Sequence, residues 1–399
     1  MLDRTCSTLQ PIARPVAQER ARPVVAMGRL SRRQQERITR AASAACLEVE
    51  FLDGDSPATP WFDSHDALAV LVALGQPGTE ATCISIRSNP ALSPVPILGL
   101  AQEVQELSFA DIYGVGGDDV VNLTNPVALE RRFHTLPRNL AHQAPTPRGK
   151  VLLVDADDRR RLLMARLLRN AGYDIHFSLD VRELGEMALS ADIVLVAVDV
   201  ELDPAGVVGA LAATRSAGIT SPWVLSVPPK RMGRMMELTR GVSGVTLSDA
   251  FAPLENILFT ANEALRGSMA ERRSSPRLLY GATVGFRTAG READDHGFVY
   301  NISAGGLYVR TLAPLMSGDE AWIELRPPRT DRYVRLEAKV VWQRLFGPVG
   351  GATVPPGFGL CITGGSAGDL KRFQDGYGSF ARDLASVAMS MAPRQGVSQ

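Results

Sequence analysis

Cysteine is scarce in this sequence, and neither sign of charge is in excess. The four cysteines among 399 residues are scattered, without a CxxC pair or a histidine at ligand spacing. A disulfide framework or structural zinc site is therefore not expected, and a reducing, cytoplasmic location is. Lys+Arg and Asp+Glu are balanced at 43 each. We therefore expect no direct nucleic-acid binding, and any anion site must be local.

Long apolar runs and the motifs of common enzymes are also missing. The longest apolar stretches, such as Ala67 to Leu74, have the length of a strand, so no membrane segment is expected. The N-terminus has no apolar region of the kind that signal peptides carry. The five histidines show no metal spacing, and no GxSxG, Walker, HExxH, cyclase or phosphodiesterase motif is present. The sequence therefore predicts a protein that is not an enzyme and has no metal or cofactor.

A pattern of alternating strands and helices occurs twice. In the first copy, Ala67 to Leu74 is a continuous apolar run of the kind found in central parallel strands, and Ser31 and Pro126 are suited to begin helices. In the second copy, Val151 to Val154 is a predicted strand, and Asp157 or Asp158 opens the next helix. Each copy is therefore predicted to form a doubly wound parallel sheet.

Short strands separated by Gly and Pro turns replace this pattern after Glu271. They are typical of an all-β barrel or sandwich. A closing helix is expected from about Gly368 to Met389. The length fits two or three domains. The expected order is a flexible tail, a first α/β domain, a linker, a second α/β domain, an antiparallel β-barrel, and a helix with a tail, over residues 1–20, 21–137, 138–148, 149–268, 269–366 and 367–399.

Two polar segments stand out around the start of the β region. Arg273 and Arg277 form an RxxxR pattern, and Asn301, Ser303 and Gly306 form an NxSxxG pattern about thirty residues later. The planar fork of arginine pairs with phosphate oxygens and with guanine O6 and N7. Short polar side chains can reach a base edge or a phosphate, and glycine lets a backbone approach closely. Each motif alone is common, as solvated charge or as a turn, but the two together are more specific.

These motifs resemble the two signatures of PilZ domains, and the resemblance covers roughly residues 270–365. It extends to Gly-Gly-Leu-Tyr-Val-Arg-Thr after the serine, to Val340–Trp342, and to Gly357–Leu360. The resemblance implies a barrel that binds cyclic di-GMP, a bacterial second messenger with two phosphodiester charges and two guanines. The binding residues that it implies are Arg272, Arg273, Arg277, Asn301, Ser303, Gly305, Gly306 and Trp342.

Two of these residues carry a more specific expectation from the resemblance. Arg272 directly precedes the RxxxR motif, and in the family an arginine there goes with a stacked ligand dimer. We therefore expect two ligands per protomer. Trp342 stands where family members place an apolar contact to guanine.

The two α/β copies resemble the flavodoxin-like receiver domains of two-component regulators. Phosphotransfer in that family needs an acidic pair for Mg²⁺, an acceptor Asp after the third strand, a Ser or Thr after the fourth, and a Lys after the fifth. The first copy has Gly28 and Arg29 after its first strand and Leu100 at the hydroxyl position. It is therefore expected to be a pseudo-receiver.

The second copy keeps only part of the phosphotransfer set. Asp155 follows its first strand, but Ala156 replaces the second acid. Asp199 is a candidate phosphoacceptor and Ser226 matches the hydroxyl position. The lysine position falls at Ser248 or Asp249, so a cation is lost there. Asp199 is thus interpreted either as an acceptor or as an ordinary residue at a strand end.

The expected function is that of a bacterial regulator in which cyclic di-GMP binding at the barrel changes the domain arrangement and the interactions with unidentified protein partners. Two alternatives stay open, a response regulator phosphorylated at Asp199 and a scaffold that binds proteins but no nucleotide. Receiver faces commonly form dimers, so a homodimer is a further open alternative.

Overall fold

The computed structural model describes residues 22–52, 59–62, 65–89, 92–136, 147–189, 193–266, 275–288, 294–347 and 354–391. The predicted tail over 1–20, most of the predicted linker, the end of the C-terminal tail, Arg272 and Arg273 lie outside these residues. Within the described ranges, no helix is both long and apolar enough to cross a membrane.

The first α/β domain begins helices where the sequence predicts them. Ser31 caps the first helix in a capping box with Gln34, and Asn125 caps the last, with Pro126 in its first turn. The strands are β1 (Val24–Met27), β2 (Val49–Leu52), β3 (Ala69–Ala73), β4 (Ile97–Ala101) and β5 (Asp119–Asn122), and the helices are α1 (Arg32–Ala44), α2 (Thr59–Phe62), α3 (Thr79–Ser88), α4 (Glu106–Gly114) and α5 (Pro126–Thr135).

The second α/β domain repeats this plan, and Asp157 caps its first helix. Its strands are β6 (Lys150–Val154), β7 (Asp174–Ser178), β8 (Ile193–Asp199), β9 (Trp223–Val227) and β10 (Val245–Asp249), and its helices are α6 (Asp158–Asn170), α7 (Val181–Ala188), α8 (Pro204–Ser216), α9 (Pro229–Leu238) and α10 (Asn256–Arg266). The parallel sheets run β2-β1-β3-β4-β5 and β10-β9-β8-β6-β7, which is the same order in both domains. This is the flavodoxin-like order, and the doubly wound prediction is confirmed.

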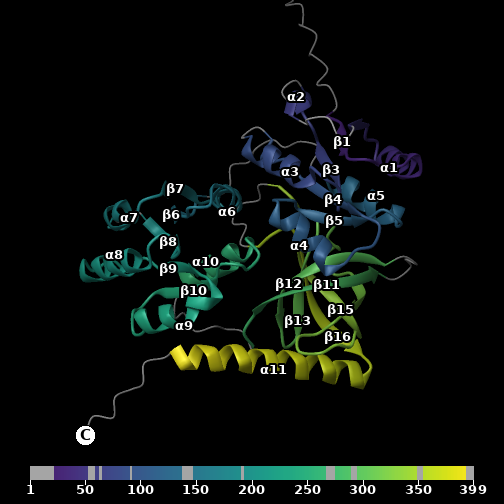
Figure 1. Cartoon of the computed structure of the whole chain (residues 1–399). Coiled ribbons are helices and arrows are strands. Elements are labelled where there is room, and N and C mark those ends of the chain that lie inside the picture. Colours follow the sequence, from purple (N-terminus) through teal and green to yellow (C-terminus); the bar gives the residue numbers. More distant parts are fainter. Residues whose placement is uncertain are drawn as a thin grey trace, which may run out of the picture.

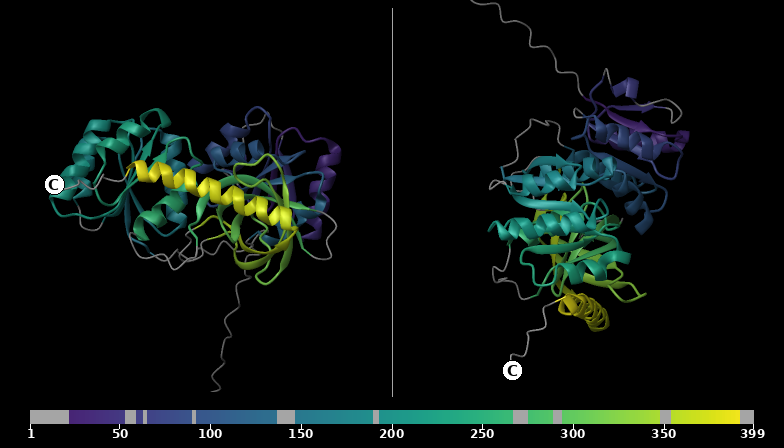
Figure 2. Two further views of the ribbon diagram at one scale, coloured as in Figure 1. Left: turned by 90° about the horizontal axis from the view of Figure 1, so that it is seen from below. Right: turned by 60° about the vertical axis from the view of Figure 1, so that its left-hand side comes forward.

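The β region closes into an antiparallel barrel, so of the two predicted architectures the barrel is correct. Its strands are β11 (Leu278–Thr288), β12 (Asp295–Ser303), β13 (Gly306–Arg310), β14 (Glu320–Leu325), β15 (Val334–Arg344) and β16 (Gly357–Gly365), paired in the order β11-β12-β13-β16-β15-β14. Helix α11 (Ala367–Met391) follows, and its Phe373 and Tyr377 are buried in the barrel core. The helix runs along one end of the barrel and extends beyond it on the side of the second α/β domain (Figures 1 and 2).

The first α/β domain packs on the barrel through a buried network of charges. Arg132 of α5 contacts Asp119 at 3.1 Å and Asp295 of β12 at 2.6 Å. Asp119 also accepts hydrogen bonds from the Thr311 hydroxyl and the Leu312 N–H. Burial opposes the charge on Arg132, but Asp295 and Asp119 outweigh it and raise its pKa. The network therefore holds α5 and the start of β5 against the barrel.

A second buried arginine lies where all three domains meet. Arg310, at the end of β13, pairs with Glu255 of the second α/β domain at 2.9 Å. Its guanidinium also lies over the Tyr113 ring of the first α/β domain, with Cζ 3.3 Å from the ring centroid. From the neighbouring strand β12, the Tyr300 hydroxyl donates to the Glu255 carbonyl at 2.8 Å. The barrel therefore contacts both α/β domains through residues of β12 and β13.

The two α/β domains also contact each other directly through Asp118, which precedes β5. Its carboxylate pairs with Arg87 of its own domain at 2.7 Å and with Arg166 of α6 at 3.1 Å. Burial acts to raise the pKa of Asp118, but Arg166 and Arg87 outweigh it and hold the pKa below its ordinary value. Asp118 is therefore a charged link between the two domains.

Candidate ligand site

A small pocket opens on the barrel beside the turn between β12 and β13. Strands β12, β13, β15 and β16 and the residue before β11 contribute to its wall. The residues that line it are Arg277, Asn301, Ser303, Gly306, Leu307, Tyr308, Val341, Trp342, Gly359 and Leu360. The structure thus brings Arg277, Asn301, Ser303, Gly306 and Trp342, all predicted ligand residues, around one cavity.

An aromatic pair forms one side of the pocket. The rings of Trp342 and Tyr308 stack, with centroids 4.9 Å apart and planes inclined by 20°. The Tyr308 hydroxyl donates to the Pro355 carbonyl at 2.6 Å, which fixes its ring. Burial raises the pKa of Tyr308 well above its usual value, so the phenol is neutral. A Cβ at Gly359 would collide with the Trp342 indole, so the glycine makes room for that ring.

A bulge in β15 aims two neighbouring side chains at the same cavity. Successive residues of a regular strand point to opposite faces. The β15–β16 register shifts between Val340 and Trp342, and Val341 and Trp342 both line the pocket. Val341 is 53% exposed. The bulge therefore places an accessible apolar group beside the indole.

The serine motif shapes the turn that borders the pocket. The Ser303 hydroxyl donates to the Gly306 carbonyl at 3.2 Å, and Asn301 is buried at the end of β12. A Cβ at Gly306 would collide with the Leu360 carbonyl oxygen of β16, so only glycine fits this close approach. A Cβ at Gly305 would meet open space, and Gly305 is not among the pocket-lining residues. The two glycines therefore have different roles.

Residues 275–277 are held by two hydrogen bonds, one to the serine motif and one to helix α11. The Ala304 N–H donates to the Ser275 hydroxyl at 3.3 Å. The Tyr377 hydroxyl of α11 donates to the Pro276 carbonyl at 2.8 Å. Arg277 follows directly and lines the pocket. Arg272 and Arg273 lie outside the described residues, so their predicted roles stay predictions.

Sequence reasoning missed several residues of the pocket and its support. Tyr308 and Gly359 lie within the segments that resemble the PilZ family, but neither had an assigned role. Tyr308 stands between two apolar residues of a strand, Leu307 and Val309. The sequence pattern therefore does not indicate that its ring stacks on Trp342. Tyr377 lies in the closing helix, and no local pattern indicates its contact with Pro276.

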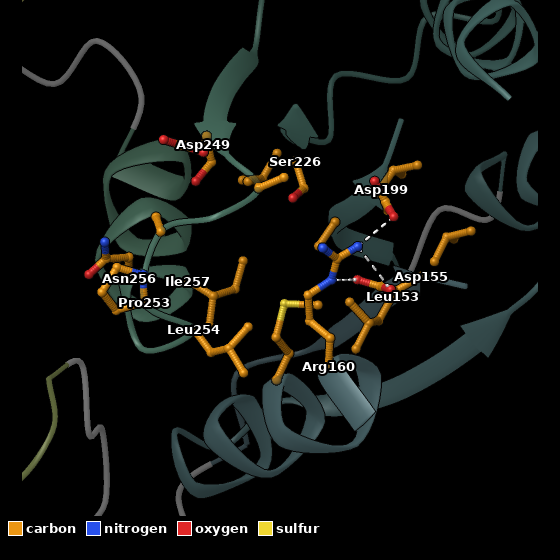
Figure 3. Close-up of a pocket in the computed structure, with 18 residues that line it drawn as sticks. Leu153, Asp155, Arg160, Asp199, Ser226, Asp249, Pro253, Leu254, Asn256 and Ile257 are labelled. Carbon is orange, nitrogen blue, oxygen red and sulfur yellow. Dashed lines mark hydrogen bonds and ion pairs between the residues drawn. The ribbon is translucent and has the colours of Figure 1, made fainter. Parts of the chain in front are cut away.

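A second candidate site lies at the carboxyl edge of the sheet in the second α/β domain. The strand register places Asp199 beside Ser226, and Ser226 beside Ser248. Asp155 follows β6 at the same edge. Arg160 of α6 pairs with Asp155 at 2.6 Å and with Asp199 at 2.5 Å (Figure 3). The sequence analysis gave Arg160 no role.

The charge on Arg160 and the number of possible metal ligands limit what this second site can bind. Burial opposes the charge on Arg160, but Asp155 and Asp199 outweigh it and raise the pKa of Arg160. Among the described residues, no group of three or more His, Cys, Asp or Glu side chains is placed to hold a metal ion.

Comparison with known proteins identifies the barrel. The sequence model of the PilZ domain family matches residues 271–375. A search of the curated proteins found no match.

Solved structures similar to parts of the chain include PilZ proteins and a response regulator. The Bacillus subtilis inhibitor of motility (MotI/DgrA) is 23% identical, with 29% of this chain and 53% of that chain covered and a TM-score of 0.23. This chain therefore spans about half the length of that protein. The PilZ domain with c-di-GMP of YcgR from Escherichia coli is 16% identical, with 30% and 98% covered and a TM-score of 0.23. The response regulator RPA3017 in red light signaling of R. palustris is 13% identical, with 29% and 90% covered and a TM-score of 0.24.

These TM-scores are low, so the family match and the sheet order are the stronger observations. Together they show that residues 271–375 form a PilZ domain and that this domain follows two α/β domains with the flavodoxin-like sheet order.

Proposed function

We propose that the barrel binds cyclic di-GMP and that the protein is a regulatory effector that acts by binding, without catalysis. The observation that supports this best is the convergence of Arg277, Asn301, Ser303, Gly306 and Trp342 on one pocket. A ligand with two phosphates and two guanines needs cationic forks, short polar groups and a flat apolar surface. This pocket offers all three kinds of group.

Each side chain has a role that its position suits. Arg277, assisted by Arg273 and Arg272 from the segment before it, pairs with a phosphate or with a guanine edge. Trp342, backed by Tyr308, offers its ring to a guanine face. Asn301 and Ser303 supply polar contacts at the end of β12. Gly306 lets the ligand approach the backbone at the pocket wall, and Gly305 stands next to it in the turn.

Isothermal titration of cyclic di-GMP into the full chain tests this assignment. Arg277→Ala is expected to weaken binding about ten- to a hundredfold, because a hydrogen bond to a charged group contributes about 1.5–3 kcal/mol. Arg273→Ala/Arg277→Ala is expected to abolish it. We expect a stoichiometry of two in the wild type.

Arg335→Ala is the matched control, since Arg335 lies on the outer surface of the barrel in an exposed pair with Glu324. It should bind like the wild type. Saturation at one ligand would rule out the stacked ligand dimer, but the protein would still be a cyclic di-GMP effector. No binding by the wild type would overturn the proposal and leave the scaffold and the response regulator as the functions to test.

We further propose that the ligand changes the arrangement of the domains. Strand β13 lines the pocket at Gly306 and ends in Arg310, which contacts both α/β domains. The Tyr308 ring lies 6.2 Å from that of Tyr300, whose hydroxyl donates to Glu255. A ligand that binds one arrangement of β12 and β13 more tightly than another would shift the junction and the protein partners that recognise it.

Small-angle scattering with and without saturating cyclic di-GMP tests this coupling. The wild-type profile is expected to change on ligand addition, and the profile of the double arginine variant is expected to stay the same. If the wild-type profile is unchanged at full occupancy, the effector acts without rearranging its domains.

A further inference from the structure

Two carboxylates at the sheet edge of the second receiver-like domain already share a cation that belongs to the chain. The Asp155 and Asp199 side chains are 1% and 7% exposed. The guanidinium of Arg160 lies between them, and its hydrogen bonds to both are drawn in Figure 3. Arg160 stands in the first turn of α6, and its side chain extends toward the two acids (Figure 3).

Every oxygen of the two carboxylates is engaged. Asp155 accepts from Arg160 Nε at 2.6 Å through one oxygen, and from Arg160 Nη2 and the Asp157 N–H through the other. Asp199 accepts from Arg160 Nη2 at 2.5 Å and from the Glu201 N–H at 3.1 Å. Arg160 therefore contacts three of the four carboxylate oxygens, and a backbone N–H contacts the fourth.

The site does not fit the Mg²⁺ ion that the receiver resemblance implies. A magnesium ion needs carboxylate oxygens at about 2.0–2.1 Å and room for its own waters. Here the guanidinium occupies the space between the oxygens. Ala156 stands where the second acid would be, and the register puts Ser248, not a lysine, next to Ser226. The sheet edge forms a pocket, which Figure 3 shows. Among the residues that line it, all within the described ranges, Arg160 is the one with a positive charge.

We propose that Arg160 is the resident cation of this domain, taking the place that a divalent ion would need between Asp155 and Asp199. Arg160 then supplies the positive charge between the two acids, and Asp199 is occupied rather than available as a phosphoacceptor. A tethered guanidinium competes well with a dissolved ion because it is always present at the site. The domain is thereby held in one state that does not depend on metal or on phosphorylation.

Binding of Mn²⁺, followed by the loss of the free-ion signal in electron paramagnetic resonance, tests this proposal on the full chain. The wild type is expected to leave the signal unchanged up to millimolar protein and metal. Arg160→Ala and Arg160→Gln are expected to bind about one Mn²⁺ at least tenfold more tightly than the wild type. Adding Asp199→Ala to either variant should remove that gain.

Arg169→Ala is the matched control, because Arg169 lies in the last turn of the same helix over the Phe177 ring. It should behave like the wild type. Circular dichroism checks that all variants are folded. Two results would overturn the proposal: Mn²⁺ binding by the wild type as tight as by the variants, and folded Arg160 variants that gain no affinity.

Incubation of the wild type with acetyl phosphate and Mg²⁺ tests whether Asp199 is available as a phosphoacceptor. No gain in mass is expected by mass spectrometry. A phosphoryl group on the wild type that is absent from Asp199→Ala would overturn the proposal and establish the response-regulator alternative.

Discussion

Replacing Arg310 with Met is expected to destabilise the protein by about 3–5 kcal/mol, because it leaves Glu255 buried without its partner. The Arg310 and Glu255 side chains are each 5% exposed. The substitution also removes the cation that lies over the Tyr113 ring. Chemical denaturation of the variant should show the junction opening at a lower denaturant concentration than in the wild type.

A second substitution distinguishes a lost ion pair from lost packing. Arg310→Met/Glu255→Leu is expected to lose less stability than the single Arg310 variant, since apolar replacement of a whole buried pair is often close to neutral. Arg335→Ala breaks the exposed pair with Glu324 and should leave the stability close to that of the wild type. Equal losses for Arg310→Met and Arg335→Ala would mean that the junction does not contribute to stability.

Gly306→Ala is expected to destabilise the barrel by about 1–3 kcal/mol and to weaken cyclic di-GMP binding. The added Cβ would collide with the Leu360 carbonyl oxygen, which is part of a neighbouring strand and cannot rotate away. Strands β13 and β16 must then separate at the pocket wall. A thermal melt and a ligand titration measure the two effects.

The preceding glycine supplies the control for stability. A Cβ at Gly305 meets nothing within 4 Å, so Gly305→Ala should have the same melting temperature as the wild type. A thermal shift of the same size in both variants would indicate that backbone flexibility of the turn matters rather than the close approach to β16.

The sequence was sufficient to predict the architecture because the signals for it are local. Apolar runs such as Ala69–Ala73 are buried strands, and Ser31 and Asp157 cap helices where they were expected to. The two PilZ-like motifs lie close together in sequence and at adjoining strand ends. The family match over residues 271–375 confirmed that resemblance.

The parts that could not be predicted depend on residues far apart in the chain. In the sequence, Arg310 is one residue of a predicted strand, and nothing there indicates that it pairs with Glu255, which belongs to another domain. Arg160 reads in sequence as one of several arginines on a polar helix face, and only the fold brings it to Asp199. Charged residues are usually exposed, so burial of a pair such as Arg132 and Asp119 has no signature in composition.

The contacts of Asp119 also bear on how the chain folds during synthesis. Leu312, whose N–H the Asp119 carboxylate accepts, lies 193 residues further along the chain. At about 5–20 residues per second, a ribosome needs roughly 10–40 seconds to make that stretch. During this time the first domain has its own sheet but not the barrel that covers α5. Arg132 and Asp119 of the first domain therefore stay hydrated while the rest of the chain emerges. Docking of this domain on the barrel is then a late step in folding.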